Sequence, residues 1–123
     1  MEIITENQLK IKPKFISDYS ATIYGGKGFT NNIRIVIALY DDTGKLTAWI
    51  RFHEDQSKIE KDSIDDTGII TMNLPVDLYQ SVLFTLRSNR PIKMLFDENT
   101  AMLMELKFEP PPPSDKIPKE KVN

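Results

Sequence analysis

The chain has 123 residues, 40% of them hydrophobic and 28% charged, and 18 acidic against 16 basic side chains give it a net charge of −2. This length fits one domain that folds without a metal or a disulfide. The chain has no cysteine, which excludes disulfides, thiol nucleophiles and thiolate metal sites. The charge balance lacks the basic excess that nucleic-acid binders usually show.

The N-terminal segment carries Glu2 and Glu6 and has no apolar core, so it does not have the pattern of a signal peptide. No stretch approaches the roughly 18 consecutive apolar residues of a transmembrane helix. Together with the absence of cysteine, these features favour a cytoplasmic location and predict no membrane partner.

The first third of the chain predicts strands. Weak alternation over 1–12 indicates one strand, and the β-branched and aromatic composition of 15–24 indicates a second, which a glycine-rich turn at 25–28 follows. The clearest strand is 33–40, because its apolar residues alternate with a period of two. One face carries Ile33, Ile35, Ile37 and Leu39, and the other carries Arg34, Val36, Ala38 and Tyr40.

A hairpin is predicted next. The segment 41–45, Asp-Asp-Thr-Gly-Lys, favours a tight turn because aspartate opens such turns and glycine adopts the left-handed conformation. The polar stretch 54–66 predicts a surface loop, and 67–73 predicts another short strand. The partner strand of the hairpin, 46–53, alternates: Leu46, Ala48, Ile50 and Phe52 are expected to face the core, and Thr47, Trp49, Arg51 and His53 to face away.

One helix is predicted over Val76 to Ser88. Pro75 suits its start, Asp77 places negative charge at the positive end of the helix dipole, and Pro91 forbids continuation. The apolar stripe of this helix must be buried across a sheet face or the open end of a barrel. The stripe consists of Leu78, Val82, Leu83 and Leu86.

A last hairpin is predicted from 91–97 and 100–109, joined by the turn Glu98-Asn99. The proline run that begins at Pro110 ends regular structure, because proline cannot donate a hydrogen bond into a strand ladder.

We therefore predict a mainly β fold: an antiparallel sandwich or bent barrel of about seven strands, with one short helix packed over the core. A single β-rich domain is expected over 1–110. The Pro- and Lys-rich tail, 111–123, is expected to be disordered.

Three segments, YDDTGKLTAWIRF, LPVDLYQSVLFTLRSNRPIKMLF and KFEP, carry a resemblance. They resemble a group of small bacterial hypothetical proteins with a Leu-Arg-Asn-Glu-Lys-Pro-like segment after a short helix and a Glu-Pro that closes the last strand. This chain departs by inserting Ser88 and by having Arg90 where lysine is usual. The resemblance covers 40–110 and implies a compact β fold with one helix, and it carries no activity over. The matching residues are Leu86, Arg87, Asn89, Arg90, Pro91, Glu109 and Pro110.

The search for catalytic groups is mostly negative. His53 is the one histidine of the chain and cannot supply the usual metal constellation. No nucleophile elbow or phosphate-binding loop is present, and the aspartates of 41–42 and 62–66 lack the spacing of a calcium loop. We therefore predict no metal, no cofactor and no enzyme. A small enzyme with His53 as its acid or base is a third hypothesis.

The most informative feature is the predicted outward face of the first hairpin. Trp49 and Arg51 lie on it with Tyr40 and Arg34 of the neighbouring strand, whereas a solvated sheet face is usually polar. Burying a tryptophan removes about 150–250 Å² from water, so something should cover it. The candidates are the protein's own helix or second sheet, a symmetric partner, or a ligand or foreign protein.

These observations predict a non-catalytic binding or assembly module that acts through this aromatic face. The expected partner is a second copy, which forms a homodimer, or another protein. The alternative is a small barrel that binds single-stranded nucleic acid by stacking bases on aromatic rings and neutralising phosphates with arginine. The predicted binding residues are Tyr40, Trp49, Arg51, His53 and Arg34.

Overall fold

The computed structural model of the chain describes residues 13–26 and 32–106. One helix, α1 (Tyr79–Leu86), follows a 3-10 turn, Val76–Leu78, and a second 3-10 turn spans Gln56–Lys58. The strands are β1 (Lys14–Ile16), β2 (Asp18–Ile23), β3 (Ile33–Tyr40), β4 (Leu46–His53), β5 (Ser63–Ile64), β6 (Ile70–Pro75), β7 (Ile92–Asp97) and β8 (Thr100–Glu105).

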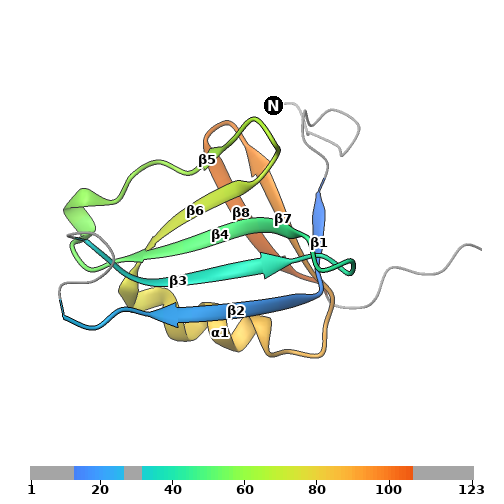
Figure 1. The fold of residues 1–123 in the computed structure, drawn as a ribbon, viewed down its shortest axis with the longest axis horizontal. Coiled ribbons are helices and arrows are strands. Elements are labelled where there is room, and N and C mark those ends of the chain that lie inside the picture. Colours follow the sequence, from blue (N-terminus) through green and yellow to red (C-terminus); the bar gives the residue numbers. More distant parts are fainter. Residues whose placement is uncertain (1–12, 27–31, 107–123) are drawn as a thin grey trace, which may run out of the picture.

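The strands form two sheets, one of five strands in the order β2-β3-β4-β6-β5 and one of three in the order β1-β7-β8. In Figure 1 the five-stranded sheet lies in front, and α1, β7 and β8 lie behind it. The predicted mainly β fold with one short helix is confirmed, and within the described residues the sheets do not close into a barrel. One pair departs from the antiparallel prediction, because β4 and β6 run parallel.

The core lies between the five-stranded sheet and the layer behind it. The predicted inward rows of β3 and β4 are confirmed, since Ile37, Ile50 and Phe52 have no exposed surface. They pack in one cluster with residues of α1, β7 and β8, which are Val82, Leu86, Ile92, Met94 and Ala101. The face of β3 and β4 that points away from this cluster is called the outer face below.

Two predicted strands have different limits in the structure. The segment 15–24 is not one strand, because the chain passes from the three-stranded to the five-stranded sheet at Ser17, whose N–H donates to the Tyr40 carbonyl at 2.8 Å. The strand predicted at 67–73 begins at Ile70, since 65–68 forms a turn that the Asp65 side chain closes.

The helix lies where the sequence placed it, but it is shorter than predicted. Pro75 precedes the 3-10 turn, and regular α-helix ends at Leu86 instead of Ser88. Val82, Leu83 and Leu86 are buried, as the apolar stripe required, whereas Leu78 is 41% exposed because it lies in the 3-10 turn.

The final hairpin turns at Glu98 and Asn99, which both have positive φ, 48° and 72°. On β8 the core side carries Ala101 and Leu103, while Met102 and Met104 are exposed. The strand predicted at 1–12, the end of the strand predicted at 100–109 and the tail 111–123 lie outside the described residues.

Asp62 joins the two sheets. Its Oδ1 accepts the Asn73 N–H of β6 at 2.7 Å, and its Oδ2 accepts the Ala101 N–H of β8 at 2.8 Å. Both donors belong to buried residues, and Asn73 lies beyond the end of the short neighbouring strand β5. The Asp62 carboxylate therefore accepts the hydrogen bonds of two backbone N–H groups that have no partner in a neighbouring strand.

Candidate functional site

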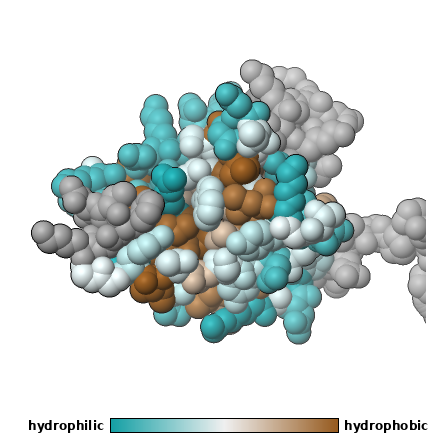
Figure 2. All heavy atoms as spheres, in the orientation of Figure 1, coloured by the Kyte–Doolittle hydropathy of each residue, from teal (hydrophilic) through white to brown (hydrophobic). Residues whose placement is uncertain are grey.

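The outer face carries the predicted binding residues. Helix α1 and the three-stranded sheet pack on the opposite face of the five-stranded sheet. Within the described part of the chain, the protein's own helix and second sheet therefore do not cover Trp49, which was the first of the three expected possibilities. Figure 2 shows the outer face, where hydrophobic atoms reach the surface in the middle and hydrophilic atoms surround them. Trp49 lies half-buried among its own strand neighbours.

Trp49 and Arg51 lie two positions apart on β4 and line one small hollow of about 140 Å³. Tyr24 and Val36 complete its walls. Within the described chain the Arg51 guanidinium makes no hydrogen bond or ion pair. The hollow therefore offers an indole and a charged donor group to an incoming molecule.

Tyr40 shares the outer face but does not extend the Trp49 site. Tyr40 lies opposite Leu46 on β4, and the residue opposite Trp49 is Ala38. The Tyr40 hydroxyl lies 3.2 Å from the Ser20 hydroxyl, at the other neighbouring strand. Among the described residues no aromatic cluster forms on this face, and the ring pair of Phe52 with Tyr79 lies in the core.

Arg34 is already engaged by its surroundings. Its guanidinium donates to the carbonyls of Tyr24 at 3.0 Å and Gly26 at 2.7 Å, and it pairs with Glu54 at 3.2 Å. These bonds tie the end of β2 to the loop after β4. Arg34 thus has a structural role in this structure, and its predicted part in binding would require breaking these bonds.

His53 points away from the core, as predicted, but it is only 3% exposed. Asn73 Oδ1 lies 2.8 Å from its Nε2, and Asn32 Nδ2 lies 3.0 Å from its Nδ1. Both amides are oriented by backbone partners, because Asn73 Nδ2 donates to the Lys61 carbonyl and Asn32 Oδ1 accepts the Asp55 N–H. The network therefore selects the arrangement in which Nε2 donates and Nδ1 accepts.

Sequence reasoning missed a repeated turn. Residues 41–44 and 65–68 both read Asp-Asp-Thr-Gly, and this repetition was the signal that could have found it. In the first turn Asp41 Oδ1 accepts the N–H of Thr43 at 2.9 Å and that of Lys45 at 3.0 Å. Asp65 makes the same bonds with the corresponding residues of the second turn, at 2.9 and 3.0 Å.

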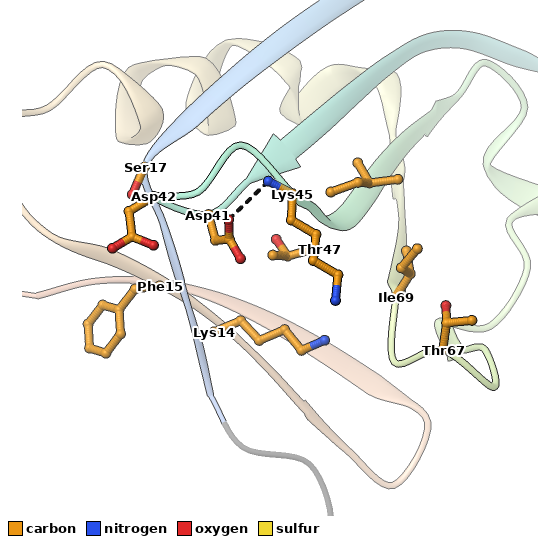
Figure 3. Close-up of a pocket in the computed structure, with 10 residues that line it drawn as sticks. Lys14, Phe15, Ser17, Asp41, Asp42, Lys45, Thr47, Thr67 and Ile69 are labelled. Atoms are coloured by element: carbon orange, nitrogen blue, oxygen red, sulfur yellow. Dashed lines mark hydrogen bonds between the residues drawn. The ribbon is translucent and has the colours of Figure 1, made fainter.

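The two turns border a larger hollow of about 430 Å³ at one end of the sandwich. Figure 3 shows the side chains of Lys14 and Lys45 extending into the space between the first turn and Thr67. The Lys14 ammonium donates to the Gly68 carbonyl, and the Thr47 hydroxyl donates to the Leu39 carbonyl at 3.1 Å. The Lys14 bond links the three-stranded sheet to the second turn, and the Thr47 bond lies within the five-stranded sheet, so these two groups have a structural role.

The two turn aspartates should make stability depend on pH. Hydrogen bonds from the Thr43 hydroxyl and the Lys45 N–H lower the pKa of Asp41 below its ordinary 3.8, and bonds from Thr67 and Ile69 lower the pKa of Asp65. A carboxyl whose pKa is lower in the folded than in the unfolded chain stabilises the fold above its unfolded pKa. This stabilisation is lost as the pH falls through the folded pKa.

We expect the double variant Asp41→Asn, Asp65→Asn to be less stable than the wild type at neutral pH. Its urea midpoint should also fall less between about pH 7 and pH 3, because the linked protonation is gone. Asp42→Asn is the control, since the Asp42 carboxylate makes no hydrogen bond with any described residue. If the urea midpoint of the double variant changed with pH as much as that of the wild type, this prediction would be contradicted.

The described residues include no group of three His, Asp or Glu side chains that could hold a metal ion. Among them, too, no helix has the length and apolarity needed to cross a membrane. Comparisons of the chain with protein-family models, with curated proteins and with solved structures found no match. The resemblance to small bacterial proteins therefore stays a prediction.

Proposed function

We propose that this protein is a non-catalytic binding or assembly module that acts through the outer face, centred on Trp49 and Arg51, and that it self-associates there. The observation that carries the proposal is the half-buried indole beside a guanidinium that pairs with no described residue. Tryptophan and arginine are the residues that most often anchor protein interfaces.

The dimensions of the face support this proposal. Strands of eight residues such as β3 and β4 are about 27 Å long, and five strands at about 4.8 Å spacing are roughly 20 Å across. The sheet face therefore covers on the order of 500 Å², whereas a stable interface buries about 800 Å² per partner. The sheet would supply the larger part of such an interface, and the bordering loops would supply the rest.

The solution mass of the wild type and of Trp49→Glu tests this proposal. By light scattering we expect a dimer for the wild type and a folded monomer for the variant, because a buried carboxylate without a partner is strongly unfavourable. Phe84→Glu is the matched control: it removes an aromatic ring that is 78% exposed on α1 and adds the same charge. This control should remain a dimer.

Two results would contradict self-association through the outer face. One is a wild type with the mass of a single chain at every concentration. The other is a Trp49→Glu variant that keeps the wild-type mass while circular dichroism shows an intact fold.

A second candidate function is single-stranded nucleic-acid binding. It is favoured by the indole and the guanidinium of Trp49 and Arg51, which line one hollow and could stack on a base and neutralise a phosphate. The engagement of Arg34 by Glu54 reduces the positive charge of this face. Retention of labelled oligonucleotides at low salt that is lost in Trp49→Glu would support this function, and no retention would exclude it.

A further inference from the structure

Strand β2 is an open edge of the five-stranded sheet. It pairs with β3 on one side, and no described residue pairs with it on the other. Five of its six residues are exposed, and Ile23 is 65% exposed. The strand contains no lysine, proline or glycine, the residues that usually protect such edges. The opposite edge, β5, has only two residues and offers much less backbone.

The register shows which backbone groups of β2 are available. The Tyr24 N–H donates to the Arg34 carbonyl at 2.9 Å, and opposed pairs in an antiparallel ladder alternate between bonded and non-bonded. Ser20 and Thr22 therefore direct their N–H and carbonyl groups toward β3. The backbone groups of the odd-numbered residues, Tyr19, Ala21 and Ile23, point away from the sheet.

Asp18 already occupies one of these outward groups. Its Oδ1 accepts the Tyr19 N–H at 2.8 Å. The N–H groups of Ala21 and Ile23 and the carbonyls of Tyr19, Ala21 and Ile23 remain for a partner strand. This pattern of donors and acceptors is symmetric about Ala21.

We propose that β2 pairs antiparallel with β2 of a second copy of this chain, with Ala21 opposite the same residue of the other copy. Each Ala21 N–H then donates to the Ala21 carbonyl of the other copy, and each Ile23 N–H donates to a Tyr19 carbonyl. The pairing extends the five-stranded sheet across a twofold axis. It goes beyond the proposed function, because it uses the sheet edge instead of the outer face.

The side chains of β2 are compatible with a second copy. Ile23, whose side chain is mostly exposed, comes opposite Tyr19, and this contact removes apolar surface from water. Asp18 is the one charged residue of the strand. In this register the two Asp18 residues lie about 20 Å apart along the strands, which is beyond the screening length of about 8 Å at physiological salt.

The surface near this edge also favours a partner. Figure 1 shows β2 passing in front of α1. Hydrophobic atoms reach the surface along the same edge in Figure 2, and Ile23 at the end of β2 is 65% exposed. A twofold axis at Ala21 brings this apolar margin of one copy close to that of the other.

Charge variants at position 21 test the register. Ala21→Lys and Ala21→Glu each place like charges directly opposite one another, so each alone should halve the wild-type mass in light scattering. An equimolar mixture of the two should recover it, because opposite charges then face each other. Ser63→Lys, on the exposed edge strand β5, is the control and should keep the wild-type mass. Single variants that keep the wild-type mass, or a mixture that does not recover it, would overturn the proposal.

Amide hydrogen exchange gives a second test in the wild type. In a monomer the Ala21 and Ile23 amides point into solvent and should exchange quickly, while the Ser20 and Thr22 amides are protected. Pairing predicts that protection at Ala21 and Ile23 rises with protein concentration. Fast exchange of both amides at the highest concentration would overturn the pairing.

These results separate the edge from the outer face. A dimer lost in Trp49→Glu but kept in Ala21→Lys overturns the edge pairing and leaves the proposed function standing. The reverse pattern supports the edge and contradicts self-association through Trp49. Loss of only half of a tetrameric mass in each variant supports both contacts.

Discussion

Phe52→Ala is expected to lower the free energy of unfolding by about 3–5 kcal/mol, the usual cost of removing a buried aromatic ring. Phe52 has no exposed surface. Its ring meets that of Tyr79 edge to face, with centroids 5.4 Å apart and planes at 88°. This contact joins the inner face of β4 to the start of α1, so the cavity would lie between the sheet and the helix.

Urea unfolding followed by the fluorescence of the single tryptophan measures this effect. Trp49 lies on the opposite face of β4 from Phe52, so its native signal should change little. Phe52→Leu is the control and should cost less than about 1.5 kcal/mol, since it keeps most of the apolar volume. If Phe52→Ala lowered the free energy of unfolding by less than about 1 kcal/mol, Phe52 would not be a major contributor to the core.

Asp62→Ala is expected to lower the free energy of unfolding by about 2–4 kcal/mol. The substitution leaves the buried N–H groups of Asn73 and Ala101 without an acceptor, and each such group costs about 1–3 kcal/mol. The effect should be large for a polar loop residue, because the carboxylate connects β6 to β8 across the two sheets.

Two further variants calibrate the Asp62 result in the same urea experiment. Asp62→Asn retains one acceptor oxygen and should lose roughly half as much stability as Asp62→Ala. Asp66→Ala removes a nearby exposed carboxylate that bonds to no described residue and should change stability by less than about 0.5 kcal/mol. Equal effects of Asp62→Ala and Asp66→Ala would show that the two bonds contribute little.

The two proposed contacts are geometrically compatible. Pairing through β2 would place the outer faces of two copies side by side in one continuous sheet, because β2 and β3 are neighbours. The Trp49 sites would then lie on the same side of the extended sheet. Such a dimer would present two Trp49 hollows to a third molecule, whereas one copy presents one.

Local patterns determined much of the fold. The alternation over 33–40 and 46–53 identified the inward rows because side chains of a strand point alternately to its two faces. The turn at 41–45 followed from its aspartate and glycine, which favour that backbone conformation wherever the chain is. Pro75 and Pro91 bounded the helix for an equally local reason, since proline lacks the N–H that a helix interior requires.

Other features depended on residues that are distant in sequence. The strand breaks at Ser17 because the two halves of 15–24 join different sheets. The amino-acid composition of the segment does not indicate which sheet each half joins. On β8, Met102 and Met104 form one row and Ala101 and Leu103 the other, and the structure turns the second row toward the core. Alternation alone gives two equivalent faces, and only packing against another layer selects one of them.

The candidate site divides in the same way. The sequence by itself placed Trp49, Arg51, Tyr40, Arg34 and His53 on one face of a hairpin. Tertiary structure decided which of them are available, since Glu54 and two carbonyls engage Arg34, and Asn32 and Asn73 enclose His53. Alternation assigns a side chain to a face, but its hydrogen-bond partners come from segments about 20 residues away, which only the folded chain brings together.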